Sequence, residues 1–469
     1  MNLSQDAIQQ AIAKVLAEMA REQTVDNAGR PAYVNGIFNS VDQAVECAVQ
    51  AQKRLVSMSL ESRHKVIDAI RQAALVNNEE LCRLAVEETG LGRVEDKFKE
   101  NELCAKYTPG PEDLTQRAFS GDDGLTLLEH APVGVIGALT PVTNSTGTLI
   151  NNTISMVSAG NAVVYNCHPS AKLTTQKVIR LFNKAITQAG APEGLVNAIA
   201  EPTLETANEL MSHPKVNMLV ATGGPHVVKA VLSSGKKAIG AGAGNPPALV
   251  DETAIIRKAA EDIVAGHSIN NNIFCISEKE VVVVDEVAGS LLKFMGETGK
   301  AKILTPDETA KVEKAIFKED GSLNPSCIGK NIQKILQKAG IDCGENLRCA
   351  VFEAAKDHPL VWKEQMMPVL PVVRVKDVWE GIELAVELEQ GNRHTATMHS
   401  TNVAHLTAFA RAVQTTIFVK NGPSYAGLGL GGEGYPSFTI AGPTGEGITT
   451  AKNFTRERRC TLVEGFRII

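Results

Sequence analysis

The chain has 469 residues and a formal net charge of -6, and 43% of its residues are hydrophobic. This length allows two or three domains with a large buried core, and the moderate charge gives no reason to expect nucleic acid or a membrane surface as a partner. No apolar run approaches the roughly 20 residues of a membrane helix, and no leader resembles a secretory signal, so we expect the protein to stay inside the cell.

Residues 1–20 form the first predicted element. Five apolar side chains recur on one face of a helix there, namely Ile8, Ile12, Val15, Leu16 and Met19. A polar stretch with Gly29 and Pro31 follows, which indicates a linker. Such a helix either docks on its own domain or serves as a peptide that binds another protein.

Helical periodicity continues for about 50 residues from Ser40, which forms a predicted capping box with Gln43. Short apolar strands then alternate with helices. The predicted strands are "VGVIGAL" (Val133–Leu139), "NAVVYN", "LVNAIA" and "VNMLVAT", and a second block from about residue 246 adds "EKEVVVVDE" and "MPVLPVVRV". Repeated strand-turn-helix units predict parallel α/β layers, and the tail "RERRCTLVEGFRII" is prone to form a strand.

Three glycine-rich loops are candidates for binding a ligand. Gly427, Gly429 and Gly432 fit G-x-G-x-x-G, but no helix follows, so we interpret this segment as a tight irregular loop. Residues 238–250, "AIGAGAGNPPALV", suggest backbone that closely approaches a ligand or another chain. Thr222-Gly223-Gly224 follows a strand and precedes Pro225, which fits the first turn of a helix, so this turn is either an anion site or a structural connection.

The cysteines are odd in number and scattered, and they include no C-x-x-C pair, which suits reduced intracellular thiols. They are Cys47, Cys82, Cys104, Cys167, Cys275, Cys327, Cys343, Cys349 and Cys460. The clustered histidines His394, His399 and His405 have no matching cysteine pair, so no metal site is predicted. Cys275 follows three asparagines in "SINNNIFCISE", and it is either a small core residue or a nucleophile.

Several motifs, in this order and spacing, resemble the aldehyde dehydrogenase superfamily. They are "ETGLGRVEDK", "APVGVIGALTPVTNST", "VATGG", "AGAGNPPALVDETA", "NNNIFC", "MMPVLPVVRV", "GNRHTATMHS" and "NGPSYAGLGLGGEGYPSFTIAGPTGEG". The resemblance covers nearly the whole chain. It is closest to the coenzyme A-acylating branch that acts on acetaldehyde or propionaldehyde in bacterial microcompartments, and it implies an α/β fold with a Rossmann-type nucleotide domain, a catalytic α/β domain and a β oligomerisation element.

The resemblance identifies Cys275 as the catalytic nucleophile. Chemistry of this type needs a thiol with a lowered pKa or good stabilisation of the anion that forms. Asn144 matches the family's donor to the oxyanion, with the backbone N–H of Cys275 as the second donor, and one such donor is worth roughly 3–4 kcal/mol of barrier. We expect Asn270, Asn271 and Asn272 to build the turn that presents the thiol.

The resemblance also implies where the cofactor binds. Thr140, Pro141 and Val142 match the loop under the nicotinamide ribose. Thr222, Gly223 and Gly224 match the turn at the helix start.

Glu364 matches the glutamate that holds the ribose hydroxyls, although it also fits a solvent-facing residue before a strand. At "CHPSAK" the chain departs from the hydrolytic enzymes, because His168 and Ala171 replace lysine and glutamate around Pro169, so the adenine end must be held differently. We expect NAD as the cofactor. NADP stays open, because the polar residues that normally contact the adenosine ribose are replaced.

Hydrolytic relatives carry a glutamate as general base in an "ELGGK"-like loop. The corresponding residues here, Ile239–Asn245, contain no carboxylate. Because such a base is worth roughly 100- to 10,000-fold, water is a poor acceptor of the acyl group, whereas the thiol of coenzyme A needs no such help. His394 and His399 are interpreted as packed histidines without a role in proton transfer.

The expected activity converts a two- or three-carbon aldehyde, coenzyme A and NAD to an acyl-CoA and NADH. The alternatives are a hydrolytic aldehyde dehydrogenase or a non-catalytic shell-associated protein. The predicted segments are a targeting helix (1–20) that binds microcompartment shell proteins, a nucleotide domain (21–245), a catalytic domain (246–435) and a return segment with an oligomerisation strand (436–469). We expect a homodimer or homotetramer inside a microcompartment.

Overall fold

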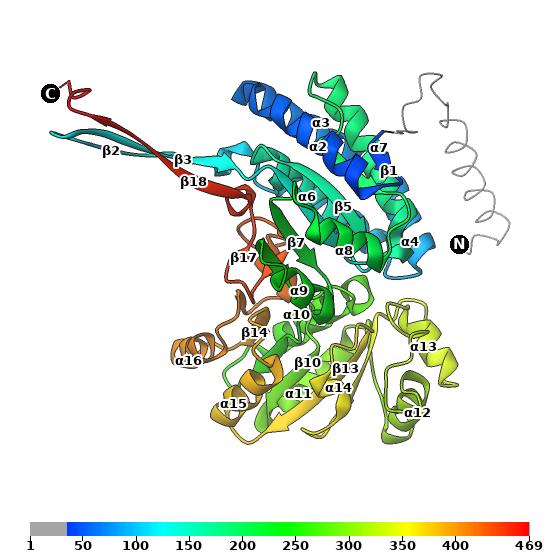
Figure 1. Cartoon of the computed structure of the whole chain (residues 1–469). Coiled ribbons are helices and arrows are strands. Elements are labelled where there is room, and N and C mark those ends of the chain that lie inside the picture. Colours follow the sequence, from blue (N-terminus) through cyan, green and yellow to red (C-terminus); the bar gives the residue numbers. More distant parts are fainter. Residues whose placement is uncertain (1–34, 469) are drawn as a thin grey trace.

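The computed structural model of the protein describes residues 35–468. The predicted helix of residues 1–20 and its linker lie outside this range. Two parallel sheets form the body, one above the other in Figure 1, and a narrow antiparallel sheet projects from the upper one. The predicted α/β class is therefore confirmed.

The first sheet has six parallel strands in the order β1-β6-β5-β4-β7-β8. Their bounds are β1 (Ile37–Phe38), β4 (Val135–Thr140), β5 (Ala162–Cys167), β6 (Val196–Ile199), β7 (Met218–Thr222) and β8 (Lys237–Ala241). From β4, the strands β5 and β6 are added on one side of the sheet, and β7 and β8 are added on the other side. The strand order therefore reverses between β4 and β7, which is the place where doubly wound sheets bind ligands.

Helices cover both faces of this sheet. They are α2 (Val41–Val56), α3 (Leu60–Val76), α4 (Asn78–Thr89), α5 (Val94–Tyr107), α6 (Ser145–Ser158), α7 (Lys172–Gln188), α8 (Leu204–Ser212) and α9 (Pro225–Leu232). The Ser40 side chain accepts a hydrogen bond from the Gln43 N–H at 3.5 Å, so half of the predicted capping box is present, and the reciprocal bond is absent among the described residues. Pro225 begins α9 directly after the glycine turn, as predicted.

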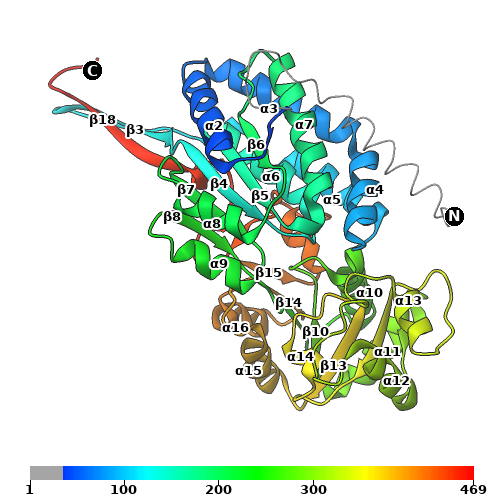
Figure 2. The ribbon, with the colours of Figure 1, turned by 45° about the vertical axis from the view of Figure 1, so that its right-hand side comes forward.

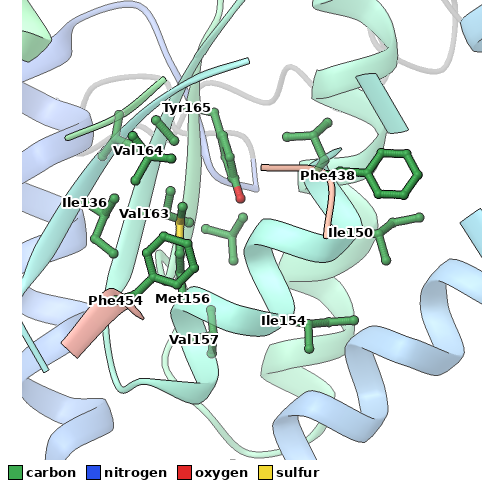
Figure 3. Packing of buried hydrophobic residues seen from close by; sticks show 14 of the residues in the cluster. Ile136, Ile150, Ile154, Met156, Val157, Val163, Val164, Tyr165, Phe438 and Phe454 are labelled. Atoms are coloured by element: carbon green, nitrogen blue, oxygen red, sulfur yellow. The ribbon is translucent and has the colours of Figure 1, made fainter. Parts of the chain in front are cut away.

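The core of this half lies between β4, β5 and α6, as Figure 3 shows. Tyr165 is fully buried there, and its hydroxyl is within 2.9 Å of the Thr153 hydroxyl. Phe438 and Phe454 belong to the same cluster although they come from the last forty residues of the described chain, so the C-terminal segment closes this core.

The second sheet has seven parallel strands in the order β11-β12-β13-β10-β9-β14-β15. They are β9 (Pro247–Val250), β10 (Glu280–Val284), β11 (Ala301–Ile303), β12 (Cys349–Glu353), β13 (Val369–Val375), β14 (Thr395–His399) and β15 (Ile417–Lys420). Its helices are α10 (Ile256–Ser268), α11 (Asp285–Glu297), α12 (Pro306–Ile316), α13 (Ile332–Lys338), α14 (Pro359–Trp362), α15 (Val378–Glu389) and α16 (Val403–Val413). The predicted strands "EKEVVVVDE" and "MPVLPVVRV" correspond to β10 and β13.

The projecting sheet consists of β2 (Arg117–Gly121), β3 (Gly124–Pro132) and β18 (Thr455–Val463), which pair antiparallel in the order β18-β3-β2. Figure 2 shows this ribbon leaving the body with the C-terminus at its tip. Before β18, the short strands β16 (Ile440–Ala441) and β17 (Gly447–Ile448) pack back on the first half, where β16 contacts β8. No helix within residues 35–468 has both the length and the apolar character needed to cross a membrane.

Candidate active site

A cavity of about 460 Å³ lies where β4, β5 and β7 end, at the reversal of strand order. Thr140, Cys167 and Thr222 are the last residues of these three strands, and all three line the cavity. The opposite wall comes from the second half of the chain, including Cys275, Glu364 and Phe438. The cavity therefore lies between the first sheet and the segment that carries the candidate nucleophile.

Every residue that the sequence singled out for this site lines the one cavity. The set is Thr140, Pro141, Val142, Asn144, His168, Pro169, Thr222, Gly223, Gly224, Cys275 and Glu364. His394 and His399 do not line it, and both are buried. Within the described part of the chain, no group of three or more His, Cys, Asp or Glu side chains is arranged to hold a metal ion.

The three asparagines before Cys275 have left-handed backbone conformations, with φ values of 49° at Asn270, 55° at Asn271 and 63° at Asn272. Asparagine tolerates this region better than other residues with a side chain. All three are buried, and their side chains are hydrogen-bonded to separate parts of the protein. The prediction that they build the turn before the thiol is confirmed.

Lys279 fastens this turn from inside the protein. Its ammonium donates to the Asn272 carbonyl at 2.8 Å, to Asn272 Oδ1 at 2.7 Å and to the Phe274 carbonyl at 3.2 Å. Burial lowers the pKa of Lys279, while the Glu364 carboxylate opposes that shift. A buried cation thus lies behind Cys275. Sequence reasoning missed it, because a lysine next to a strand usually faces solvent.

Burial raises the pKa of the Cys275 thiol to about 12, and the Glu364 carboxylate raises it further, whereas Lys279 acts in the opposite direction. Cys275 is therefore a neutral thiol near pH 7. Of the two requirements that the chemistry set, a lowered pKa is not met in this state, so stabilisation of the developing anion carries more weight.

Glu364 is half-buried and lines the cavity, and its contact with the ribose hydroxyls stays a prediction. Its Oε1 accepts a hydrogen bond from the Gly244 N–H at 3.4 Å, and burial raises its pKa. Glu364 is the only carboxylate among the residues that line this cavity.

The loop of residues 239–245 presents only Gly242 and Ala243 to the cavity. Gly244 is wedged: a Cβ there would lie 2.7 Å from the Cys275 carbonyl oxygen and 3.0 Å from Cγ of the His394 ring. His394 is therefore packed close to the nucleophile's backbone, with Nδ1 within 2.9 Å of the Thr395 hydroxyl and its pKa lowered by burial to about 4. These contacts agree with a packed, neutral histidine.

Asn144 occupies the N-cap position of α6 but makes no capping hydrogen bond. Its Oδ1 instead accepts from Asn270 Nδ2 at 3.2 Å. No carbonyl within residues 35–468 accepts the backbone N–H of Cys275. Two donors at this cavity, one side-chain amide and one backbone N–H, are thus available to an anion.

The cavity walls also contain residues that sequence reasoning did not single out. Phe438 packs against Phe274 with ring centroids 4.9 Å apart, and Met366, two residues after Glu364, has a left-handed φ of 46°. A Cβ on Gly147 would lie 2.6 Å from the Phe438 ring, so this glycine in α6 makes room for it. An aromatic residue in the "SFTIAGPTGEG" motif was the available signal for Phe438.

The sequence profile of the aldehyde dehydrogenase family matches residues 35–434. The chain belongs to this family. Acetaldehyde dehydrogenase (acetylating) EutE of Escherichia coli strain K12 is 45% identical to it over 473 aligned positions, covering 100% of both chains. The resemblance to the coenzyme A-acylating branch of the aldehyde dehydrogenases is thereby confirmed.

Solved structures of aldehyde dehydrogenases agree. The propionaldehyde dehydrogenase of Rhodopseudomonas palustris, solved with bound coenzyme A and an acylated cysteine, is 49% identical with a TM-score of 0.91, covering 93% of this chain and 100% of that one. A propionaldehyde dehydrogenase from the fucose utilisation bacterial microcompartment of Clostridium phytofermentans is 48% identical with a TM-score of 0.91, covering 92% and 100%.

Proposed function

We propose that this protein oxidises a short aldehyde and transfers the acyl group to coenzyme A, with NAD as hydride acceptor. The observation that carries the proposal is that one cavity contains Cys275, Asn144 and the loop residues Gly242 and Ala243. These two residues have no carboxylate that could act as the general base of a hydrolytic enzyme. Its acyl-transfer half is supported by the relative with bound coenzyme A and an acylated cysteine.

The residues present fit a dinucleotide. The Thr140 hydroxyl is buried and has no partner among the described residues. A Cβ on Gly223 or Gly224 would meet nothing within 4 Å, so there is room beside this turn. The Gly223 N–H is bonded to the Ala241 carbonyl, whereas no carbonyl of residues 35–468 accepts the Gly224 N–H, which is open to an anion at the start of α9. Thr140, Pro141, Val142 and Glu364 would then hold the nicotinamide ribose, and His168 and Pro169 would line the adenine end. When bound, the nicotinamide supplies an acceptor for hydride.

In the proposed reaction, the Cys275 thiol gives its proton to solvent as its sulfur attacks the carbonyl carbon, and a thiohemiacetal forms. The developing oxyanion receives hydrogen bonds from Asn144 Nδ2 and the Cys275 N–H. Loss of hydride from the same carbon leaves an acyl thioester on Cys275. The thiol of coenzyme A then attacks this thioester and breaks its bond to the Cys275 sulfur. That sulfur takes up a proton in place of the one lost by coenzyme A, and acyl-CoA leaves, so the order is ping-pong.

Glu364 favours a second candidate, hydrolysis to the free acid, because it is a carboxylate in the same cavity as the thioester. Its bond to the Gly244 N–H and its proposed contact with ribose hydroxyls assign it to binding instead. An assay with acetaldehyde and propionaldehyde, with and without coenzyme A, separates the two. We expect sustained NADH formation only with coenzyme A and none with Cys275→Ala. Full-rate acid formation without coenzyme A would favour hydrolysis.

We further propose packaging in a microcompartment through residues 1–20, and a homodimer or homotetramer. Packaging is supported by the predicted amphipathic helix and by the microcompartment origin of one relative. Assembly is supported by the projecting sheet, whose β18 is exposed from Arg456 to Val463. Deletion of residues 1–20 is expected to preserve turnover and abolish co-sedimentation with shells. Severe loss of activity in the soluble truncated protein would oppose it.

A further inference from the structure

The motif "ETGLGRVEDK" (residues 88–97) has no role in the proposed reaction. In the structure it forms the end of α4, a turn and the start of α5, and it lies directly behind Asn270. Gly92 makes room for that side chain, since a Cβ there would lie 2.0 Å from Asn270 Oδ1. Asp96 Oδ2 accepts from the Asn270 N–H at 2.9 Å. The motif is thus built around one asparagine.

The hydrogen bonds fix which way the Asn270 amide points. The backbone N–H of Arg93 donates to Asn270 Oδ1 at 2.9 Å, and because a backbone N–H can only donate, this atom must be the oxygen. Nδ2 of Asn270 therefore faces the opposite side. There it donates to both carboxylate oxygens of Glu100, at 2.9 and 3.0 Å.

The same Nδ2 also donates to Asn144 Oδ1 at 3.2 Å. This bond in turn assigns the oxygen of Asn144, so its Nδ2 is the atom left for the cavity, and no protein acceptor binds that nitrogen among residues 35–468. Without Asn270 nothing in the described chain would distinguish the two ends of the Asn144 amide, because its usual capping bond to α6 is absent. An inverted amide would present an oxygen to an oxyanion.

The surroundings hold this relay rigidly. Asn270, Glu100 and Lys97 are all at most 2% exposed. The Lys97 ammonium donates to the Thr143 carbonyl at 2.7 Å, which fixes the peptide immediately before Asn144. Helix α5 therefore holds Asn144 in two ways. Lys97 binds the peptide before Asn144, and Glu100 binds Asn270, which in turn binds Asn144.

We propose that Asn270, oriented by the Arg93 N–H and Glu100, is a positioning residue that turns the Asn144 amide so that its N–H faces the reacting oxygen. The proposal rests on the function proposed above. Its effect is on the acylation step: the amide orientation matters where negative charge develops, and it matters little for binding the neutral aldehyde.

The test uses the full chain and two matched variants. Asn270→Gly removes the amide while glycine keeps the left-handed backbone, and Asn271→Gly does the same at the adjacent residue, whose Nδ2 donates to Gly329 and Asn331 and not to Asn144. Both variants are compared for thermal unfolding and for the single-turnover rate of NADH formation. We expect similar losses of Tm, but a rate roughly 10- to 100-fold lower only for Asn270→Gly, with little change in KM for aldehyde.

A double-variant cycle with Asn144→Ala decides the mechanism. Asn144→Ala alone is expected to lower the rate roughly 100- to 1000-fold, and adding Asn270→Gly to it should cost no more than about twofold further, because Asn270 acts through Asn144. Multiplicative losses, or an Asn271→Gly rate as low as that of Asn270→Gly, would overturn the proposal. If Cys275→Ala or Asn144→Ala keeps the parent rate, the proposed function fails as well, which distinguishes the two failures.

Discussion

Glu364 and Cys275 line the same cavity. Burial is the largest cause of the raised pKa of the Cys275 thiol, and the Glu364 carboxylate is the second largest. Because the thiol's pKa is about 12, its thiolate fraction rises about tenfold for each unit of pH between 7 and 9. We expect the alkylation of Cys275 by iodoacetamide in the cofactor-free protein to follow this slope without a plateau. The measurement is mass spectrometry of the peptide that contains Cys275.

Replacing this carboxylate should change the same reaction. A negative neighbour disfavours the thiolate, so Glu364→Gln should lower the thiol pKa and speed alkylation several-fold at each pH. Glu319→Gln, a change at an exposed acid outside the cavity, is the control and should leave the rate as it was. A plateau near pH 8 in the parent protein, or equal rates in the two variants, would show that this account of the thiol is wrong.

Gly244 should not tolerate a side chain. Gly244→Ala places a Cβ 2.7 Å from the Cys275 carbonyl and 3.0 Å from the His394 ring, so the nucleophile must move. A displacement of about 1 Å can cost roughly 100-fold in rate, and we expect a loss of kcat of that order together with a lower Tm. At Gly242 the added Cβ meets nothing within 4 Å, so Gly242→Ala should keep the parent Tm. Equal Tm for both variants would contradict the packing described.

A carboxylate introduced into the loop should restore hydrolysis. Ala243 lines the cavity that contains Cys275, so Ala243→Glu brings a general base toward the thioester. We expect acid formation without coenzyme A to rise roughly 100-fold or more over the parent. Ala243→Gln has nearly the same size and no base, and it should not show the rise. The measurement is NADH formation and acid release from propionaldehyde, and equal rates for Glu and Gln would exclude base catalysis from this position.

Glu280 should destabilise the protein at high pH. It is buried, neither of its carboxylate oxygens has a partner among the described residues, and burial raises its pKa well above the usual value. A carboxyl group whose pKa is raised in the folded state makes its full contribution to stability only below its unfolded pKa of roughly 4.3. That contribution is lost as the pH rises toward the folded-state pKa. Between pH 5 and pH 9 the stability of Glu280→Gln should rise relative to the parent by about 1–3 kcal/mol, measured by chemical denaturation. A difference that shrinks with pH would reverse this sign.

Local pattern in the sequence was enough to predict the α/β class, and the resemblance to aldehyde dehydrogenases supplied the residues predicted for the cavity. Apolar strands and their turns predicted β4, β5, β6 and β7, because strand periodicity and turn chemistry are short-range signals. The motifs at Thr140 and Thr222 follow such strands, and parallel strands bring their ends together at one edge. Their presence in one cavity follows from topology.

The missed features all depend on contacts between distant parts of the chain. Asn270 binds Glu100, which is 170 positions away, and Asn144, which is 126 away. Neither separation leaves a local periodicity. Lys279 was not singled out for the same reason, since burial of a charge is decided by tertiary packing that residue type does not report.

Phe438 and Phe454 complete the core of β4, β5 and α6 from the far end of the chain. Phe438 leaves the ribosome about 200 residues after β8, on the order of 10–40 s later at usual translation rates. During that interval the nascent first half exposes apolar surface that chaperones can hold. A premature stop codon before residue 438 would leave that surface permanently uncovered, and quality-control proteases would remove the fragment.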